Sequence, residues 1–244
     1  MNDASGITRL EHDVLDESVP VASLLRQVLI LGGHASSEPL RKWAQHELKG
    51  YSGTETAVPK YRFIAAPVKA NITSGPAQYN GREISKWDLP EEARDAVPNQ
   101  FPILWSVAEI QATIAASQEE HIRLGTSNTS DLARLMTHHQ RNLTGNFFLE
   151  VTSVYWAISV SSLKGILDQV RTQLTEFVAE IRAAMPPGAQ EPTAEAIREA
   201  VSSIQITAGD NSPIYVTAPV AIAEHDSTAE IALEATPKQR RSRS

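Results

Sequence analysis

The chain has 244 residues, of which 41% are hydrophobic and 21% charged, a composition ordinary for a folded, soluble protein. Its formal net charge is −7, which argues against a protein that coats nucleic acid. It contains no cysteine, so disulfides, thiolate zinc sites and a cysteine nucleophile are excluded. The first residues lack the basic and apolar regions of a secretory signal, and no apolar run is long enough to cross a membrane. We therefore expect a cytoplasmic protein without a membrane partner.

Two helices, each with one apolar face, are predicted near the amino end. The first begins after Ser18 and ends at the Gly32-Gly33 pair. The second begins at Ser36 or Ser37 and stops at Gly50, because glycine readily follows the last turn of a helix. The short connection between them predicts a helical hairpin.

Strand patterns begin after Pro59. Residues 60–72 and 77–84 have strand-forming composition, and Gly75-Pro76 between them is a turn signal. Pro67 cannot donate a backbone hydrogen bond, so we expect the first strand to lie at a sheet edge or to be broken by a bulge. Further along, the patterns predict helices over 89–97, 101–117 and 130–142, and strands over 122–126 and 146–160.

The longest periodic signal predicts a helix over 161–184. Its apolar residues recur in steps of three and four and form one stripe: Leu163, Leu167, Val170, Leu174, Phe177 and Ile181. Ser161 or Ser162 is expected to cap the first turn, and the Pro-Pro-Gly run over 186–188 ends the helix. Since about three heptads is short for a coiled coil, we interpret the stripe as core rather than as a seam between chains.

The predicted fold class is α+β, with an amino-terminal helical hairpin, a small mostly antiparallel sheet and the long helix, followed by a short β-hairpin segment. The predicted organisation is a flexible segment over 1–17, the α+β domain over 18–185, a linker and short helix over 186–202, a β-hairpin over 203–222, and a disordered tail over 223–244.

The predicted hairpin alternates apolar and polar residues, and we assign a role in oligomerisation to Ile204, Ile206, Ile214, Val216 and Val220. An isolated two-stranded hairpin is marginal in water, so it must dock on the domain, pair with other copies or stay disordered. The tail ends with four basic residues, which we interpret as solvated: Lys238, Arg240, Arg241 and Arg243. A weak phosphate-contacting arm, the one route to nucleic acid, is the alternative.

Catalytic motifs are sparse in the sequence. It has no glycine-rich phosphate loop, no HExxH zinc motif and no GxSxG motif, so we predict neither a metal nor another cofactor. Arg134 and His139 form an Arg-x4-His pair that resembles the motif of HEPN-type ribonucleases, where such residues act on a 2′-hydroxyl and its phosphate. A separation of five residues puts the two side chains about 140° apart on an ideal helix. A toxin-like ribonuclease is therefore the alternative function.

Three blocks between about 18 and 184 stand out: PVASLLRQVLILG, LRKWAQHELKGYSGTETAVPKYR and YWAISVSSLKGILDQVRTQLTEFVAEIR. The second follows a W…EL-G-Y…P-YR spacing through Trp43, Glu47, Leu48, Gly50, Tyr51, Pro59, Tyr61 and Arg62. The third follows a yW-I…GILD-VR pattern through Tyr155, Trp156, Ile158, Gly165, Ile166, Leu167, Asp168, Val170 and Arg171. In these blocks the chain resembles the AbiTii-type domain of bacterial abortive-infection (anti-phage) proteins.

The resemblance implies phage defence but supplies neither a reaction nor a set of catalytic residues. We interpret Gly50 as a helix stop, Pro59 as a turn, and Trp43 and Trp156 as core. The alternative is that some of the matching residues form a ligand or partner surface, built from Glu47, Tyr61, Arg62, Asp168 and Arg171.

Our leading hypothesis is a non-enzymatic sensing or assembly module in abortive-infection defence, which binds a partner or ligand and forms a homo-oligomer. The expected partner is a protein of the same defence system or a phage component.

Overall fold

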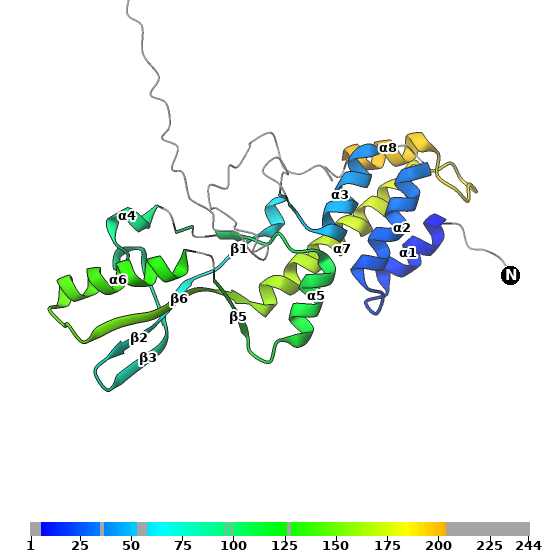
Figure 1. The fold of residues 1–244 in the computed structure, drawn as a ribbon. Helices are drawn as coiled ribbons and strands as arrows, with labels where there is room; N and C mark the ends of the chain where they lie inside the picture. Colours follow the sequence, from blue (N-terminus) through cyan, green and yellow to red (C-terminus); the bar gives the residue numbers. More distant parts are fainter. Residues whose placement is uncertain are drawn as a thin grey trace, which may run out of the picture.

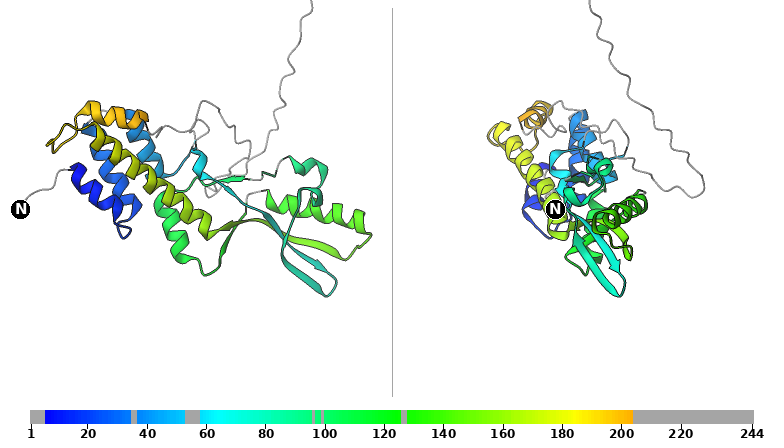
Figure 2. Two further views of the ribbon diagram at one scale, coloured as in Figure 1. Left: turned by 180° about the vertical axis from the view of Figure 1, so that it is seen from behind. Right: turned by 90° about the vertical axis from the view of Figure 1, so that its left-hand side faces the viewer.

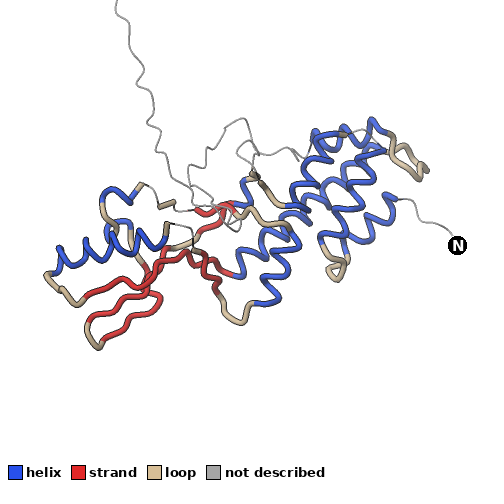
Figure 3. Tube along the Cα trace, viewed as in Figure 1, coloured by secondary structure: helices blue, strands red, loops and turns tan. Residues whose placement is uncertain are grey.

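In the computed structural model, the described residues are 6–34, 37–52, 58–95, 97–98, 100–125 and 128–203. They form an elongated molecule with a helical body at one end and an arm made of a sheet and a covering helix at the other (Figures 1 and 3). A view from behind and a view from the side show the same division (Figure 2). The α+β fold class is confirmed.

The helical body contains α1 (Gly6–Leu15), α2 (Val21–His34), α3 (Glu38–Lys49), α5 (Val107–Ala116), α7 (Val160–Ala184) and α8 (Ala194–Ser203). The predicted helical hairpin is α2 and α3, which pack on one another. The body core includes Leu24, Leu25 and Val28 of α2, which are completely buried against residues of α7.

The arm contains β2 (Val68–Ser74), β3 (Ala77–Glu83), β5 (His121–Leu124), β6 (Leu149–Ser159), α4 (Glu91–Arg94) and α6 (Thr129–Thr144). The four strands lie in the order β3-β2-β6-β5, and every neighbouring pair is antiparallel. Helix α6 packs against β6 and buries Met136 completely. Two short 3-10 helices, η1 (Lys60–Arg62) and η2 (Lys86–Asp88), and a second sheet of β1 (Phe63–Ala65) and β4 (Gln100–Pro102), complete the structure.

Helix α7 belongs to both halves of the molecule. Its first turns place Leu163 and Ile166 in the core of the arm, and its later turns place Val170 and Phe177 in the core of the body. The apolar stripe predicted from the sequence is therefore core. The cap differs from the prediction: Ser159 precedes the helix, and its side chain accepts a hydrogen bond from the backbone N–H of Ser162 at 3.0 Å.

Several predicted elements have other bounds in the structure. The strand predicted over 60–72 is broken before Pro67, because proline has no N–H for the ladder, and its two parts join different sheets. The helix predicted over 101–117 begins only at Val107, where Ser106 and Glu109 form a reciprocal capping box. Residues 100–102 are a strand instead.

The amino end differs more strongly from the prediction. The prediction of a flexible segment over 1–17 is wrong for residues 6–15. These residues form α1, and Ile7, Leu10 and Val14 are buried. The short helix predicted within 186–202 is α8, and its residues Ile197, Ala200 and Val201 join the body core. The predicted hairpin over 203–222 and the tail over 223–244 lie outside the described residues, apart from Ser203 at the end of α8.

The packing of α1 gives a direct test. Leu10→Ala removes a completely buried side chain and should lower the free energy of unfolding by about 2–5 kcal/mol, whereas Leu15→Ala on the same helix removes an exposed one and should change it by about 0.5 kcal/mol or less. Urea titration of both variants measures the difference. Equal stabilities would contradict the position of α1.

Candidate functional site

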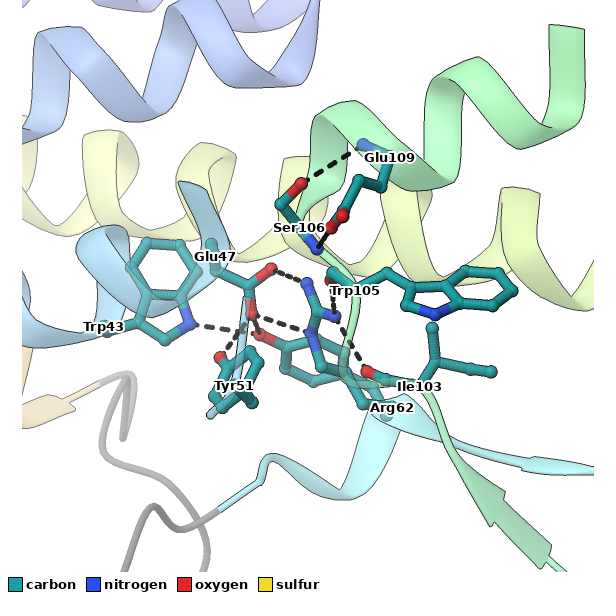
Figure 4. A network of polar contacts seen from close by, with 9 residues as sticks. Trp43, Glu47, Tyr51, Arg62, Ile103, Trp105, Ser106 and Glu109 are labelled. Carbon is teal, nitrogen blue, oxygen red and sulfur yellow. Dashed lines mark hydrogen bonds and ion pairs between the residues drawn. The ribbon is translucent and has the colours of Figure 1, made fainter. Parts of the chain in front are cut away.

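A buried polar network lies where the arm meets the body (Figure 4). Glu47 of α3 and Arg62 of η1 form an ion pair whose two side chains are both 0% exposed. Arg62 Nη2 donates to Glu47 Oε2 at 2.5 Å, and Arg62 Nε donates to Oε1 at 3.2 Å. Such paired hydrogen bonds match the fork of a guanidinium to both oxygens of a carboxylate. The ion pair is thus completely desolvated and held in one geometry.

Three aromatic residues complete this network. The hydroxyls of Tyr51 and Tyr61 donate to Glu47 Oε1 at 2.6 and 2.5 Å, and Trp43 Nε1 donates to the Tyr61 oxygen at 3.0 Å. The guanidinium carbon of Arg62 also lies 4.6 Å from the centre of the Tyr51 ring. We call Trp43, Glu47, Tyr51, Tyr61 and Arg62 the junction network.

Arg62 also fastens the junction network to a third part of the chain. Its Nη1 atom donates to the carbonyl oxygens of Ile103 and Trp105, at 2.9 and 2.6 Å, in the segment between β4 and α5. The backbone N–H of Ile103 donates in return to the Arg62 carbonyl at 2.8 Å. One side chain therefore joins α3, η1 and the start of α5.

Gly50 allows these segments to come together. Its φ of 88° lies in the left-handed region that side-chain-bearing residues rarely adopt, and its N–H donates to the His46 carbonyl as the helix cap. A Cβ atom here would lie 2.8 Å from the Leu104 carbonyl oxygen. The next residue, Tyr51, donates its backbone N–H to that same oxygen. The interpretation of Gly50 as a helix stop is confirmed.

The electrostatics of the junction network keep both tyrosines neutral. Burial, and then the negative charge of Glu47, raise the pKa of Tyr51 and of Tyr61 above the ordinary value of 10.0. Burial alone lowers the pKa of Arg62, but its hydrogen bonds to Glu47 and the charge of Glu47 outweigh that effect, so its pKa is raised. The network contains one anion, one cation and hydroxyl donors. The hydroxyls and the guanidinium donate their hydrogen bonds to the carboxylate at its centre.

The residues proposed from the sequence as a ligand or partner surface separate into two places. Glu47, Tyr61 and Arg62 meet in the junction network, and the complete burial of Glu47 and Arg62 removes both from any surface. Asp168 and Arg171 lie on α7, where Asp168 is exposed. Arg171 Nη1 donates to the carbonyl oxygens of Val14 and Asp16, each at 3.0 Å, so it fastens the connection between α1 and α2.

The Arg-x4-His pair is divided between two sides of α6. The side chain of Arg134 is 81% exposed and forms an ion pair with Asp131 one turn earlier. His139 points elsewhere, because its Nε2 atom is buried and has no hydrogen-bond partner. This arrangement agrees with the rotation of about 140° expected for five residues of helix. Within the part of the chain that the structure describes, no group of three or more potential metal ligands comes together.

An exposed apolar surface lies at the free end of the arm, in the connection between α6 and β6 (Figure 1). Phe147 and Phe148 are 79% and 78% exposed, and Leu143, in the last turn of α6, is 66% exposed. We call these three residues the apolar tip. The strand predicted over 146–160 includes both phenylalanines, but strand β6 begins only at Leu149.

Hydrogen bonds hold the backbone of the apolar tip in place. Gly145, with a φ of 67°, closes α6 by donating to the Arg141 carbonyl at 2.9 Å. The side-chain oxygen of Asn146 accepts from the N–H of Phe148 at 3.0 Å, and its nitrogen donates to Ser74 Oγ at 2.8 Å. The Gly-Asn pair before two phenylalanines is the sequence signal that could have predicted this turn. The tip is a preorganised apolar projection.

A comparison with protein families identifies the family to which the chain belongs. A model of the AbiTii family matches residues 7–206, which is more than half of the chain. The chain belongs to the AbiTii family. The match includes α8 and all of α1 except Gly6, so it extends beyond the predicted domain over 18–185 at both ends. Neither the curated proteins nor the solved structures gave a match. Among the described residues, no helix is long and apolar enough to span a membrane.

The second block of the AbiTii resemblance largely coincides with the junction network. Trp43, Glu47, Tyr51, Tyr61 and Arg62 all belong to both, and Gly50 provides the turn that joins them. The carboxylate of Glu47 and the guanidinium of Arg62 are buried and bonded to one another. In this AbiTii chain the motif therefore holds the arm on the body.

The ion pair gives the first prediction for this site. Glu47→Ala leaves the Arg62 charge buried without its partner, which should lower the free energy of unfolding by about 3–5 kcal/mol. The matched control is Glu38→Ala, which removes exposed ion pairs with Arg41 and Lys42 and should cost about 1 kcal/mol or less. Chemical denaturation of both variants would show the prediction to be wrong if the two losses were alike.

The buried tyrosines predict how stability depends on pH. Because folding raises the pKa of Tyr51 and Tyr61, the unfolded chain releases these protons first as the pH rises. Their contribution to stability is fully present below the unfolded pKa of 10.0 and is lost progressively above it. Equilibrium unfolding between pH 8 and about 11 should show a fall that is less steep in Tyr51→Phe. The exposed Tyr79→Phe serves as the control and should keep the original slope.

Proposed function

We propose that this AbiTii protein is a non-enzymatic assembly module of abortive-infection defence, which binds a protein partner and associates with further copies of itself. The observation that carries this proposal is the burial of the family motif. The chemically versatile side chains of that motif are used inside the junction network, where they hold two parts of one chain together. A scaffold, rather than a reaction centre, is what such a motif provides.

The apolar tip supports a contact function. Exposed apolar groups that lie together are typical of surfaces that bind other proteins, and aromatic residues contribute strongly to such contacts. The hydrogen bonds around Asn146 reduce the entropy lost when the tip is fixed by a partner. The expected partner is a protein of the same defence system, a phage component or another copy of the chain.

Self-association is assigned to the apolar residues of the segment that follows α8. Ile204, Ile206, Ile214, Val216 and Val220 alternate with polar residues, and a two-stranded unit of this length needs a further surface to be stable. The toxin-like ribonuclease is the second candidate from the sequence. The opposite positions of Arg134 and His139 on α6 do not favour it, because general acid–base chemistry requires both groups at one phosphate.

Solution mass tests the assembly function. We expect the full chain to be an oligomer by light scattering, and the chain ending at Ser203 to be a monomer that keeps the helical content of the described fold. The shortened chain ends at Ser203 because α8 contributes Ile197, Ala200 and Val201 to the body core. A chain that ended earlier would lose part of this core together with the carboxyl segment. An oligomer of equal size in both proteins would contradict the role of the carboxyl segment.

A further inference from the structure

We propose that strand β5 receives an extended segment of a partner protein, which joins the sheet of the arm as a further strand in a groove between β5 and α5. The segment that this groove fits is one in which acidic residues alternate with apolar ones. The inference rests on the proposed function, because it gives the protein partner named there a binding site and a chemical character.

Strand β5 lies at an edge of the sheet, where β6 is its one neighbour. The N–H of Val160 donates to the Glu120 carbonyl at 2.9 Å, and in an antiparallel ladder the residues that exchange hydrogen bonds alternate with those that do not. Ile122 therefore bonds to β6, whereas the N–H and C=O groups of His121 and Arg123 point away from it. Such a row of donors and acceptors is what an extended peptide uses to join a sheet.

A groove of about 480 Å³ lies beside this edge. Thr113 and Ala116 of α5 form one side of it, and β5 contributes His121, Ile122 and Arg123. Helix α5 and strand β5 are joined by a short connection (Figure 1). The volume is within the range of binding clefts, about 300–1,000 Å³. Because the side chains from α5 are small, the groove has room for those of an added strand.

The two faces of β5 set the side-chain pattern that an added strand needs. Ile122 packs against the core of the arm, whereas His121 and Arg123 are exposed. Residues directly opposite one another on neighbouring antiparallel strands lie on the same face. A segment residue opposite Ile122 therefore meets that side chain together with Thr113 and Ala116, which favours an apolar residue. The residues on either side of it lie on the exposed face.

Arg123 favours a carboxylate on that exposed face. Its guanidinium carbon lies 5.1 Å from the centre of the Tyr155 ring, which holds the side chain over the sheet. Within the part of the chain that the structure describes, no carboxylate forms an ion pair with Arg123. Opposite charges on directly opposed residues stabilise strand pairing. The exposed positions of the added strand are therefore acidic.

Other pairings of strands match these features less well. Strand β5 reads HIRL and contains no carboxylate, so β5 of a second copy would leave Arg123 without an opposite charge. The other edge of the sheet is β3, whose ladder with β2 has a register shift between Ala70 and Ile72. Such irregularities hinder the addition of a strand. The edge at β5 combines a regular ladder with a groove and an available cation.

The experiment uses the full-length chain and the fluorescein-labelled peptide EVEVEVE, with KVKVKVK as its control, in fluorescence anisotropy titrations. We expect saturable binding of EVEVEVE with a dissociation constant lower than that of KVKVKVK by about fivefold or more, because its carboxylates lie opposite Arg123. The variant Arg123→Glu should reverse this preference. Equal affinities for the two peptides in the unmodified chain would overturn the proposal.

A second variant tests the backbone pairing. His121→Pro removes an outward N–H but keeps the charge of Arg123, and proline is tolerated as the first residue of an edge strand, so binding of EVEVEVE should be lost. The matched control is Glu83→Pro on β3, which also points outward because the N–H of Ile84 bonds to the Val68 carbonyl, and it should bind normally. Binding that survives His121→Pro would show attraction to charge alone and overturn strand addition.

Methylation of the backbone nitrogens of the glutamates in EVEVEVE removes the same hydrogen bonds from the peptide side. This test does not depend on the folding of a variant, and we expect the methylated peptide not to bind. Binding equal to that of the unmodified peptide would contradict the pairing.

The outcomes separate this inference from the proposed function. If EVEVEVE does not bind but the full chain is an oligomer by light scattering, the groove is overturned and self-association stands. If the peptide binds saturably to a chain that is monomeric at every concentration, the groove stands and self-association is overturned.

Discussion

The ion pair of Glu47 and Arg62 is the interaction on which the arrangement of this molecule depends. Removing two charges from water is costly, and the structure compensates with hydrogen bonds to nearly all of their polar atoms. That compensation requires α3, η1 and the start of α5 to adopt one relative position. A core of apolar side chains would tolerate small shifts of these segments, whereas directed hydrogen bonds to a buried charge do not.

The same network explains how a family motif can be distinctive without describing a reaction. The side chains of the motif are of kinds that often serve as catalytic groups: a carboxylate, a guanidinium and two tyrosines. Here they are bonded to one another at the place where the arm meets the body. The exposed apolar tip lies outside this network.

Sequence patterns predicted the elements that pack by simple periodicity. The stripe of α7 and the hairpin of α2 and α3 are clear from their spacing, because each has one continuous buried face. Helix α1 has a similar but shorter signal in Ile7, Leu10 and Val14, which spans only about two turns and does not by itself distinguish a packed helix from a flexible segment. The strand predicted over 60–72 is interrupted at Pro67, and the helix predicted over 101–117 begins only after Ser106. The periodicity of apolar residues does not reveal these two boundaries, because each depends on the backbone hydrogen bonding of a single residue.

The candidate site was harder to predict from the sequence than the fold. Glu47 and Arg62 were selected by their spacing, but charged residues are usually exposed, and only the folded chain shows that they are buried together. Phe147 and Phe148 have strand-forming character, and their exposure depends on where β6 begins relative to the cap of α6. Neither property can be obtained from one stretch of sequence alone.

The direct passage from β6 into α7 gives the molecule a mechanical property. Ser159 is both the last residue of the strand and the cap of the helix, so no loop absorbs movement between them. One continuous backbone therefore joins the free end of the arm to the helical body at this point. A change in the angle between the arm and the body has to deform the strand, the helix or the packing around them, because no flexible connection lies between β6 and α7.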